Sequence, residues 1–351
     1  MSYMAVTTRY FTATHRHRLK LKMNKLKTRL TEQLGLVHPV ISAPMAFAAG
    51  GQLAAAVSSA GGLGMIGGGY GDPEWLGAQF RAAGNQPVGC GFITWSLQKA
   101  PHLLDQALAE GPAAVMLSFG DPGPFAEKIH AAGSLLICQC QNLEHVKAAL
   151  DVGAEVIVAQ GAEAGGHGQA RATMTLVPEV SDLLDARQSS ALLVAAGGIA
   201  DGRGLAAALM LGADGVLLGT RLWASREALV AKSHHQSILG TDGDGTIRTT
   251  VADIARQLDW PAGYSARIRR NAFTERWHGK EDELSRQALT EGRRYRQAAL
   301  EADSENAAVW FGEAAGLIRD IPSAEMIIAT MVSQAASLLR TRGGVFVSED
   351  I

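Results

Sequence analysis

Residues 152–160 read VGAEVIVAQ, and residues 211–220 repeat the arrangement as LGADGVLLGT. In both stretches a glycine follows a segment with helical patterning, and a short apolar run begins soon after it. Glycine readily adopts the left-handed conformation that ends a helix. A run of Val, Ile, Leu and Ala without polar alternation is typical of a parallel strand covered on both faces. The two stretches therefore predict helix-to-strand junctions of an α/β protein.

Similar apolar runs recur from Pro39 onward and are separated by segments with helical patterning. This alternation is the pattern of βαβ units in a parallel sheet. The candidate strands number eight, at residues 40–45, 62–68, 87–94, 113–119, 135–140, 155–160, 192–197 and 215–220. Eight units in succession predict a (β/α)₈ TIM barrel, whose active site lies at the C-terminal ends of the strands.

A doubly wound, dinucleotide-binding sheet is the main alternative fold. Its glycine fingerprint occurs as GLGMIG at residues 62–67. That run lies within a predicted strand that follows a helix, whereas dinucleotide binding needs a strand, then the glycine turn, then a helix. The barrel is therefore the better interpretation.

The regular alternation of predicted strands and helices ends after the eighth strand. The next 90 or so residues contain helical, charge-rich stretches and a Gly/Asp loop, so we expect a helical insertion that covers the substrate. An apolar helix near 322–340 should then return to the barrel wall. The expected domains are a basic extension at 1–27, a barrel at 28–223 and 312–342, and the insertion at 224–311.

Charge is distributed unevenly along the chain. Residues 1–31 carry eight Lys and Arg and no acid, which leaves 24 basic against 34 acidic residues in the remainder. An acidic body disfavours nucleic acid as a partner. No apolar run reaches the roughly 20 residues that span a bilayer, so we expect no membrane segment. We interpret residues 1–27 as a disordered extension of a cytoplasmic protein, although their composition also fits an organelle transit peptide.

The three cysteines, Cys90, Cys138 and Cys140, lie inside apolar strand-like runs. They do not form the disulfide framework of a small secreted protein, and a reducing compartment is the simpler inference. A redox pair of Cys138 and Cys140 is one interpretation. Buried, small apolar groups facing the helices are the more common meaning of such cysteines.

The predicted sixth strand leads into the glycine-rich run QGAEAGGHG at residues 160–168. Such a run predicts a backbone loop that approaches a flat or phosphorylated ligand, with His167 at its rim as a base or hydrogen-bond donor. The alternative is a tight loop whose histidine only satisfies a carbonyl. Metal binding is not expected, because the glycines between Glu163 and His167 disfavour a helix and no second histidine follows at ligand spacing.

Glycines also follow the seventh and eighth predicted strands, as GGIAD at residues 197–201 and LGTR at residues 218–221. In TIM barrels these two loops frequently build a phosphate site from backbone amides and the start of a short helix. The alternative is that Gly197 and Gly198 only provide a sharp exit from the barrel. A phosphate site beside apolar strand ends favours a phosphorylated cofactor.

Two further strand ends could face the same cofactor. SAPMA at residues 42–46 is small and apolar, which suits packing against a ring system as well as ordinary packing at the barrel mouth. Alternation places Gln139 on the face opposite Cys138 and Cys140, inside the barrel. A buried amide needs a partner, which either a ligand or a neighbouring side chain could supply.

These motifs occur in the order of a known family. The strings APM at 43–45, ICQ at 137–139, AQGAEAGGH at 159–167, AGGI at 196–199 and LGTR at 218–221 resemble the nitronate monooxygenases, as does FGEAAGLI at 311–318. The resemblance runs from about Thr28 to Ala336. It implies FMN across the barrel mouth and oxidation of an alkyl nitronate with O₂ to a carbonyl compound and nitrite. It leaves a homodimer open.

The resemblance also implies roles for particular residues. His167 matches the family's active-site imidazole, which removes the α-proton of a nitroalkane or only orients the nitronate. The implied cofactor-binding residues are Pro44, Met45, Ala46, Gln139, Gln160, Gly165, Gly166, Gly197, Gly198, Gly219 and Thr220. One departure is GGG at residues 67–69, where many relatives carry a side-chain amide.

Two alternatives share this pattern. The flavin-dependent enoyl-acyl carrier protein reductases have the same fold and the Gly-Gly-His loop, but they reduce a double bond with a nicotinamide cofactor. A barrel that binds a flavin or another phosphorylated ligand without catalysis is the second alternative.

Overall fold

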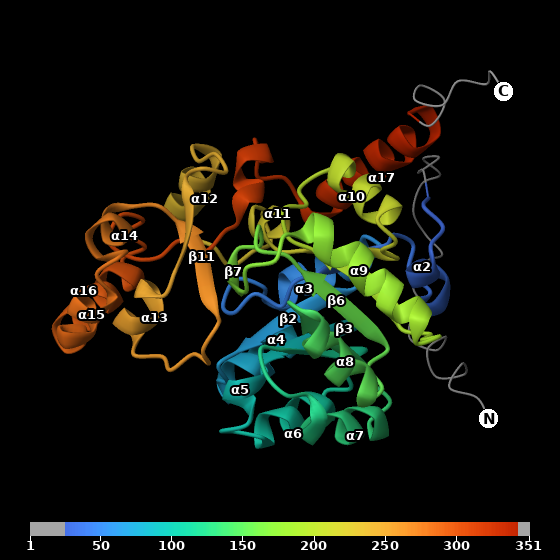
Figure 1. The fold of residues 1–351 in the computed structure, drawn as a ribbon, viewed down its shortest axis with the longest axis horizontal. Coiled ribbons are helices and arrows are strands. Elements are labelled where there is room, and N and C mark those ends of the chain that lie inside the picture. The colour runs from blue at the N-terminus through green and yellow to red at the C-terminus, as the bar shows by residue number, and fades with distance from the viewer. Residues whose placement is uncertain (1–24, 343–351) are drawn as a thin grey trace.

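The computed structural model describes residues 25–342, and an eight-stranded parallel sheet lies at its centre (Figure 1). The sheet runs in the order β1, β9, β8, β6, β5, β4, β3, β2. Its two ends meet, because Ser42 N donates to Leu63 O at 3.0 Å and Ile41 bridges to Leu63. The strands are β1 (Val40–Ser42), β2 (Gly64–Gly69), β3 (Val88–Ile93), β4 (Ala114–Ser118), β5 (Leu135–Cys140), β6 (Val156–Gln160), β8 (Leu192–Ala196) and β9 (Gly215–Leu218).

All eight predicted strands are present, and the predicted TIM barrel is confirmed. GLGMIG runs from the end of a helix into β2, so the dinucleotide arrangement is absent from it. The first and eighth strands end earlier than the sequence indicated. Pro44 has no N–H for the ladder, and Gly219, with φ −95° and ψ −86°, turns the chain out of the sheet into α11.

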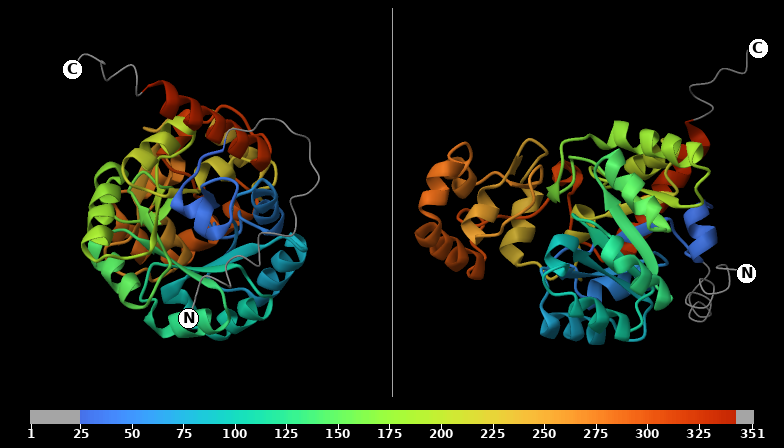
Figure 2. Two further views of the ribbon diagram at one scale, coloured as in Figure 1. Left: turned by 90° about the vertical axis from the view of Figure 1, so that its right-hand side faces the viewer. Right: turned by 60° about the horizontal axis from the view of Figure 1, so that its bottom comes forward.

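Helices form a ring around the barrel (Figure 2, left). They are α3 (Gly51–Ser59), α4 (Pro73–Ala83), α5 (Thr94–Leu97), α6 (His102–Ala109), α7 (Gly123–Ala131), α8 (Leu143–Asp151), α9 (Thr173–Ala186), α10 (Gly202–Met210), α11 (Thr220–Trp223) and α17 (Ala324–Thr341). The short α2 (Arg29–Leu34) lies across the N-terminal end, where Leu30 is fully buried against the barrel interior. The loops that follow the strands lie at the opposite, C-terminal end.

Side chains alternate between the inside and the outside of the barrel. Ile137 belongs to the interior cluster, together with residues such as Met65 and Met116. Cys138 and Cys140 belong to the outer cluster between strands and helices, where both are buried. The interpretation of these cysteines as buried small groups is confirmed, because all three thiols are free and buried.

The last helix closes the wall as expected. Ser323 caps α17 by accepting a hydrogen bond from Met326 N. The helix packs against α10, where a side chain on Gly202 would lie 2.5 Å from the backbone at Met331 and Ala335. Only glycine permits so close an approach between these two helices.

Between α11 and η1 (Glu313–Leu317) the chain builds a smaller lobe at the C-terminal end of the barrel (Figure 2, right). Its helices are α12 (Lys232–Leu239), α13 (Val251–Arg256), α14 (Ala272–Trp277), α15 (Glu281–Arg286) and α16 (Ala288–Leu300). The lobe has its own core, which includes Val251, Phe273, Leu284 and Tyr295. Besides the expected helices it contributes two strands, β10 (Thr246–Thr249) and β11 (Ser265–Arg269), which pair in antiparallel fashion.

Within residues 25–342, no helix combines the length and apolar character needed to cross a membrane. The same residues contain no group of three or more His, Cys, Asp or Glu placed to hold a metal ion. Most of the basic segment 1–27, namely residues 1–24, lies outside the described part of the chain.

Candidate active site at the barrel mouth

The loops that follow β1 and β9 lie side by side at the C-terminal mouth. Ala43 N donates to Leu218 O at 2.9 Å. A side chain on Gly219 would lie 3.7 Å from Ala43 Cβ and 4.0 Å from Met45 Sδ. The small residues after the first strand therefore border one of the predicted phosphate-binding loops.

Glycines make room for the Pro44–Ala46 segment. A Cβ atom on Gly91 would lie 2.3 Å from Pro44 Cγ, and one on Gly67 would lie 2.3 Å from Met45 O. Gly69 has φ +57° and would meet Ala46 Cβ at 3.1 Å. The run at residues 67–69, which departs from the family pattern, thus packs directly beneath this segment and offers it no side-chain amide.

Residues from two separate loops meet near Thr220. Its Oγ1 accepts a hydrogen bond from Gly312 N at 2.9 Å. Gly165 packs against the same backbone, since a Cβ atom there would lie 2.5 Å from Gly312 N. The loop after β6, the start of α11 and the chain entering η1 therefore converge at one place.

Gly197 and Gly198 complete this arrangement. Their φ angles are +108° and +72°, a region that glycine occupies without strain. A Cβ atom on Gly198 would lie 3.3 Å from Glu163 Cβ, so the loop after β8 adjoins the loop after β6. The predicted phosphate-binding residues are all half-buried, as backbone that lines an accessible site should be: Gly165, Gly166, Gly197, Gly198, Gly219 and Thr220.

Glu163 has a structural role in these loops. Its carboxylate accepts hydrogen bonds from Thr173 N at 3.0 Å and from Thr173 Oγ1 at 2.9 Å. These bonds attach the glycine-rich loop to the first turn of α9, where a negative charge is favourable. No pattern in the sequence indicates this bond.

The two predicted glutamines have different surroundings. Gln160 is buried, and its Oε1 accepts from Gln141 Nε2 at 2.9 Å while its Nε2 donates to His167 O at 3.0 Å. Gln139 is half-buried on the interior face beyond Ile137 and makes no side-chain hydrogen bond to any described residue. Gln139 therefore has an amide to offer at the mouth, whereas Gln160 holds the backbone of His167.

His167 lies on a short strand, β7 (Gly166–Gly168), rather than in an irregular loop. β7 pairs with β11 of the smaller lobe, with His167 opposite Ala266. The side chains of Arg248 and Arg267 both donate from Nε to Ala162 O, at 3.2 and 2.9 Å. The glycine-rich loop is thereby fixed to the insertion, which the sequence did not indicate.

The imidazole of His167 is buried, with 8% of the residue exposed. Its Nε2 lies 3.0 Å from Oδ1 and 2.9 Å from Oδ2 of Asp253. Burial lowers the pKa of His167 below its usual value, and the hydrogen bond that His167 Nε2 makes to the Asp253 carboxylate opposes this shift. The histidine is therefore mainly neutral at pH 7 and able to accept a proton.

Half-buried aromatic side chains surround this imidazole. Trp260 stacks on it, and Trp260 Nε1 donates to Tyr70 Oη at 3.1 Å. Further rings pack edge-on against Trp260, namely those of Trp95, Phe119 and Tyr264. Tyr70, Trp95 and Phe119 follow β2, β3 and β4, whereas Trp260 and Tyr264 come from the insertion. The insertion and three strand ends thus form one apolar wall beside His167.

Asp253 and Trp260 are site residues that sequence reasoning missed. Asp253 is 86 positions from His167. Neither Asp253 nor Trp260 belongs to a motif with recognisable spacing. Both lie in the segment predicted only as a helical cover. The sole local signal was a Trp-Pro pair at 260–261, which indicates a loop and nothing more.

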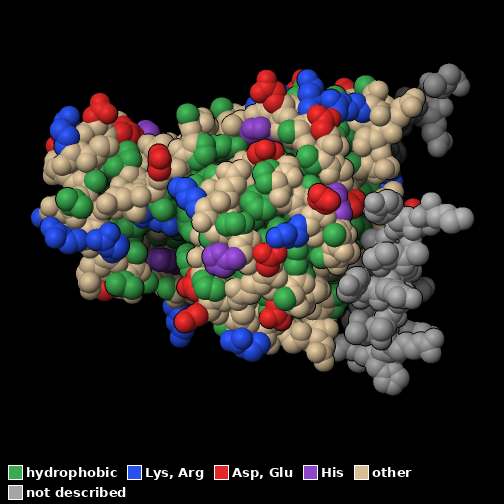
Figure 3. Space-filling model, turned by 90° about the horizontal axis from the view of Figure 1, so that it is seen from below, with side chains coloured by type: hydrophobic (Ala, Val, Ile, Leu, Met, Phe, Trp, Pro, Cys, Tyr) green, Lys and Arg blue, Asp and Glu red, His purple; other side chains and the backbone are tan. Residues whose placement is uncertain are grey.

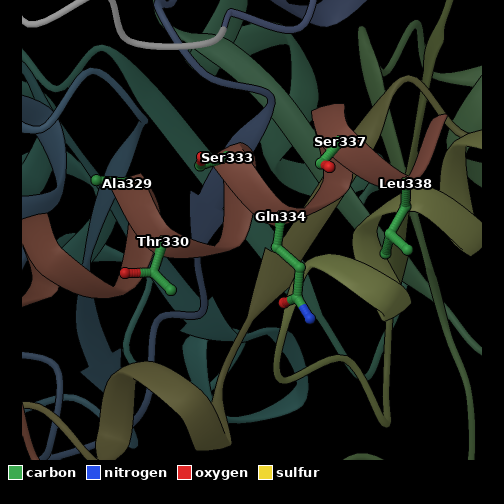
Figure 4. A pocket seen from close by; sticks show the side chains of 6 residues that line it. All are labelled: Ala329, Thr330, Ser333, Gln334, Ser337 and Leu338. Atoms are coloured by element: carbon green, nitrogen blue, oxygen red, sulfur yellow. The ribbon is translucent and has the colours of Figure 1, made fainter. Parts of the chain in front are cut away.

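The hollows elsewhere on the surface contain none of these residues. One of about 600 Å³ runs along α17 and is lined by Thr330, Gln334 and their neighbours (Figure 4). Gln334 Oε1 accepts a hydrogen bond from Gly202 N at 2.8 Å, so this side chain joins two helices. On the face shown in Figure 3, acidic and basic side chains are interspersed over both lobes.

The residues present fit a phosphorylated, planar cofactor such as FMN. Half-buried glycine backbone from three loops gathers beside Thr220, which suits a phosphate. A Cβ atom on Gly166 would have nothing within 4 Å, so space lies next to this backbone. The free amide of Gln139 could meet the polar edge of a ring.

Comparison with known proteins shows the family to which this chain belongs. The nitronate monooxygenase family model matches residues 27–91 and 93–334. A nitronate monooxygenase of Neurospora crassa is 33% identical over 86% of this chain and 90% of that protein. A hydroxy-methyl-oxo-octahydroindene-carboxyl-CoA dehydrogenase of Mycobacterium tuberculosis is 29% identical over 90% of this chain and 98% of that protein.

A solved structure shows the same architecture. FabK from Thermotoga maritima superposes with a TM-score of 0.81 and 31% identity, covering 91% of this chain and 99% of that chain. The family match spans both halves of the barrel wall, the glycine-rich loops and the insertion that carries Asp253 and Trp260. With a closed barrel whose loops meet beside a buried imidazole, this chain is an oxidoreductase of the nitronate monooxygenase family.

Proposed function

We propose that this chain binds FMN at the C-terminal mouth and oxidises alkyl nitronates with O₂ to a carbonyl compound and nitrite. The observation that carries the proposal is the convergence of half-buried glycine backbone from three loops next to His167 and a free Gln139 amide. The proposed partners are the nitronate and O₂. The segment 224–311 covers the substrate.

The proposed cofactor contacts follow from these positions. The backbone of Pro44–Ala46 would lie beside the flavin ring, and Gln139 would bind its polar edge. Gln160 adjoins the ring site and holds the His167 backbone at 3.0 Å. The phosphate would be held by backbone N–H groups and one hydroxyl, from Gly165, Gly166, Gly197, Gly198, Gly219 and Thr220.

Bound FMN supplies the redox chemistry, because it accepts electrons from the substrate and passes them to O₂. The protein's own part is to bind and orient the substrate and to manage the proton. With a neutral nitroalkane, His167 Nδ1 accepts the α-proton. With a nitronate no proton is removed, and the imidazole orients the anion. The aromatic wall around Trp260 excludes water from this place.

A second candidate is reduction of a thioester-linked substrate with a nicotinamide cofactor, as in enoyl-acyl carrier protein reductases of this fold. The similarity to a carboxyl-CoA dehydrogenase favours it. The two candidates make different predictions for the flavin's reduction.

The test is to purify the protein, record its visible spectrum and mix it without oxygen with NADH or with propionate 3-nitronate. We expect bleaching of the flavin by the nitronate, and nitrite on readmission of O₂. Rapid bleaching by NADH alone would favour the reductase, and no bleaching by either would contradict both candidate reactions. A colourless protein that FMN does not reconstitute would refute the proposal.

A further inference from the structure

Asp253 is a buried carboxylate whose shortest side-chain bonds are to His167. It lies on α13 of the smaller lobe, and only 4% of the residue is exposed. Both of its carboxylate oxygens lie within 3.0 Å of His167 Nε2. Burying a carboxylate is costly unless it is paired. The pairing of the Asp253 carboxylate with His167 Nε2 offsets this cost.

The charges around Asp253 are few. Arg256 Nη1 lies 4.0 Å from Asp253 Oδ1, and its guanidinium lies over the rings of Tyr70 and Trp310, at 5.0 and 5.4 Å. Arg248, on β10, is the other cation that acts on the imidazole. His167 thus faces one acid at hydrogen-bond distance and two more remote bases.

The carboxylate selects one tautomer of the imidazole. An ionised carboxylate only accepts hydrogen bonds, so Nε2 must carry the proton. Nδ1 then has the free lone pair, and no described residue donates to it. Trp260 holds the ring plane, and Gln160 holds the His167 carbonyl at 3.0 Å. The ring therefore has a fixed orientation as well as a fixed tautomer.

We propose that Asp253 is a positioning residue that completes the base: it fixes His167 with Nε2 protonated, so that Nδ1 can take a proton from a nitroalkane. This rests on the proposed function. The C–H bond of the α-carbon breaks, its electron pair becomes the C=N bond of the nitronate, and the proton moves to Nδ1. The Asp253 carboxylate stabilises the resulting imidazolium, which later releases the proton to water.

The test replaces the carboxylate by an amide of the same shape. Asp253→Asn should lower kcat/KM for neutral nitroethane by about 100-fold, because general-base catalysis is worth on the order of 10²–10⁴. The nitronate of the same compound needs no base, so its kcat/KM should fall by less than about 5-fold. Asp259→Asn is the matched control: Asp259 is exposed in the adjoining loop, bonds to no described side chain, and should change neither rate.

A double-mutant cycle shows whether Asp253 acts through His167. In a His167→Asn background, Asp253→Asn should cause no further loss of kcat/KM for nitroethane. The effects of substitutions at residues that act as a unit are not additive. Independent, additive losses, or equal losses with both substrate forms, would show that Asp253 is merely structural and would overturn the proposal.

A spectroscopic readout is independent of both flavin and reaction. In protein with ¹⁵N-labelled histidine, the signals absent from His167→Asn identify His167. At pH 8 we expect a protonated Nε2 and an unprotonated Nδ1 in the wild type. A protonated Nδ1 would overturn the proposal even if Asp253→Asn does not fold. Absence of turnover with nitroalkane and nitronate, together with the expected tautomer, would refute the proposed function and leave the positioning role standing.

Discussion

Trp260 lies flat on His167, with ring centroids 3.4 Å apart and an angle of 6° between the planes. The indole comes from the loop between α13 and β11, whereas the imidazole belongs to β7 beside the barrel. One face of the imidazole is thereby covered by the insertion. The smaller lobe is part of the site, since it supplies both this cover and Asp253.

Replacing Trp260 should change substrate preference. Trp260→Ala removes an apolar wall beside His167. A change of this size in an apolar pocket alters the discrimination between a small and a bulky substrate by roughly 1–3 kcal/mol. We expect kcat/KM for a bulky cyclic nitronate, relative to ethyl nitronate, to rise about 10-fold. Trp260→Phe keeps a ring at this position and should stay close to the wild type. An unchanged ratio in Trp260→Ala would place the substrate elsewhere.

The pH dependence should report His167. Because burial lowers the pKa of His167 below 6.5, the neutral base persists to lower pH than usual. The kcat/KM for a nitroalkane should rise as pH increases through this lowered pKa and then level off. In Asp253→Asn the acidic limb should move to still lower pH, because the carboxylate that favours the imidazolium is gone. An acidic limb of the wild-type profile with an apparent pKa above 6.5 would contradict this expectation.

Removing the imidazole should separate the two substrate forms. His167→Asn should lower turnover of nitroalkanes by about 10²–10⁴ and abolish the acidic limb. FMN should remain bound, because the proposed cofactor contacts come from other residues. Flavin content measured by absorbance checks the second point. Retained nitroalkane turnover would remove the catalytic role of His167.

Gly219 offers a clean test of the phosphate site. Its φ of −95° is negative and its ψ of −86° lies just beyond the helical region, and a Cβ atom would have no neighbour nearer than 3.7 Å. Gly219→Ala should therefore lower the melting temperature only slightly but weaken FMN binding by at least about 10-fold, because the methyl group intrudes beside the N–H groups. The control is Gly240→Ala, which has an exposed site and no neighbour within 3.9 Å. Equal FMN affinity in both variants would argue against this location.

Gln139 and Gln160 should respond in opposite ways. Gln160→Ala removes the acceptor of the buried Gln141 Nε2 and one donor to the His167 carbonyl, and a buried polar group left unsatisfied costs about 1–3 kcal/mol. It should lower the melting temperature by several degrees. Gln139→Ala should weaken FMN binding with little effect on stability of the apoprotein. Thermal unfolding and flavin titration of both variants would distinguish these outcomes.

The cysteines should be inert in the folded protein. Burial raises the pKa of Cys138 to about 12, and raises those of Cys90 and Cys140 as well. We expect no labelling by a thiol reagent at pH 8 and three labelled thiols after denaturation. Rapid labelling of the native protein would show that the outer layer opens.

Local sequence specified the barrel well. Each strand contains a run of four or more apolar or glycine residues, apart from the three-residue β1. The spacing of these runs and the glycines that border them are visible without any tertiary information. The strands of the insertion escaped prediction because β10 and β11 are short and carry Arg248, Arg267 and Arg269. β10 pairs with β11, and the pairing of β11 with β7 depends on contacts across about 100 positions, which no local pattern records.

The sequence by itself determined the closed barrel, the glycine loops at its mouth and the identity of His167 as the imidazole there. All of these follow from residues close together in the chain, namely apolar period, glycine position and one motif. Only the tertiary structure decided what His167 touches. Asp253 and Trp260 reach it because the insertion folds back through β11 onto β7, and the free energy for that contact comes from burial and pairing between distant segments.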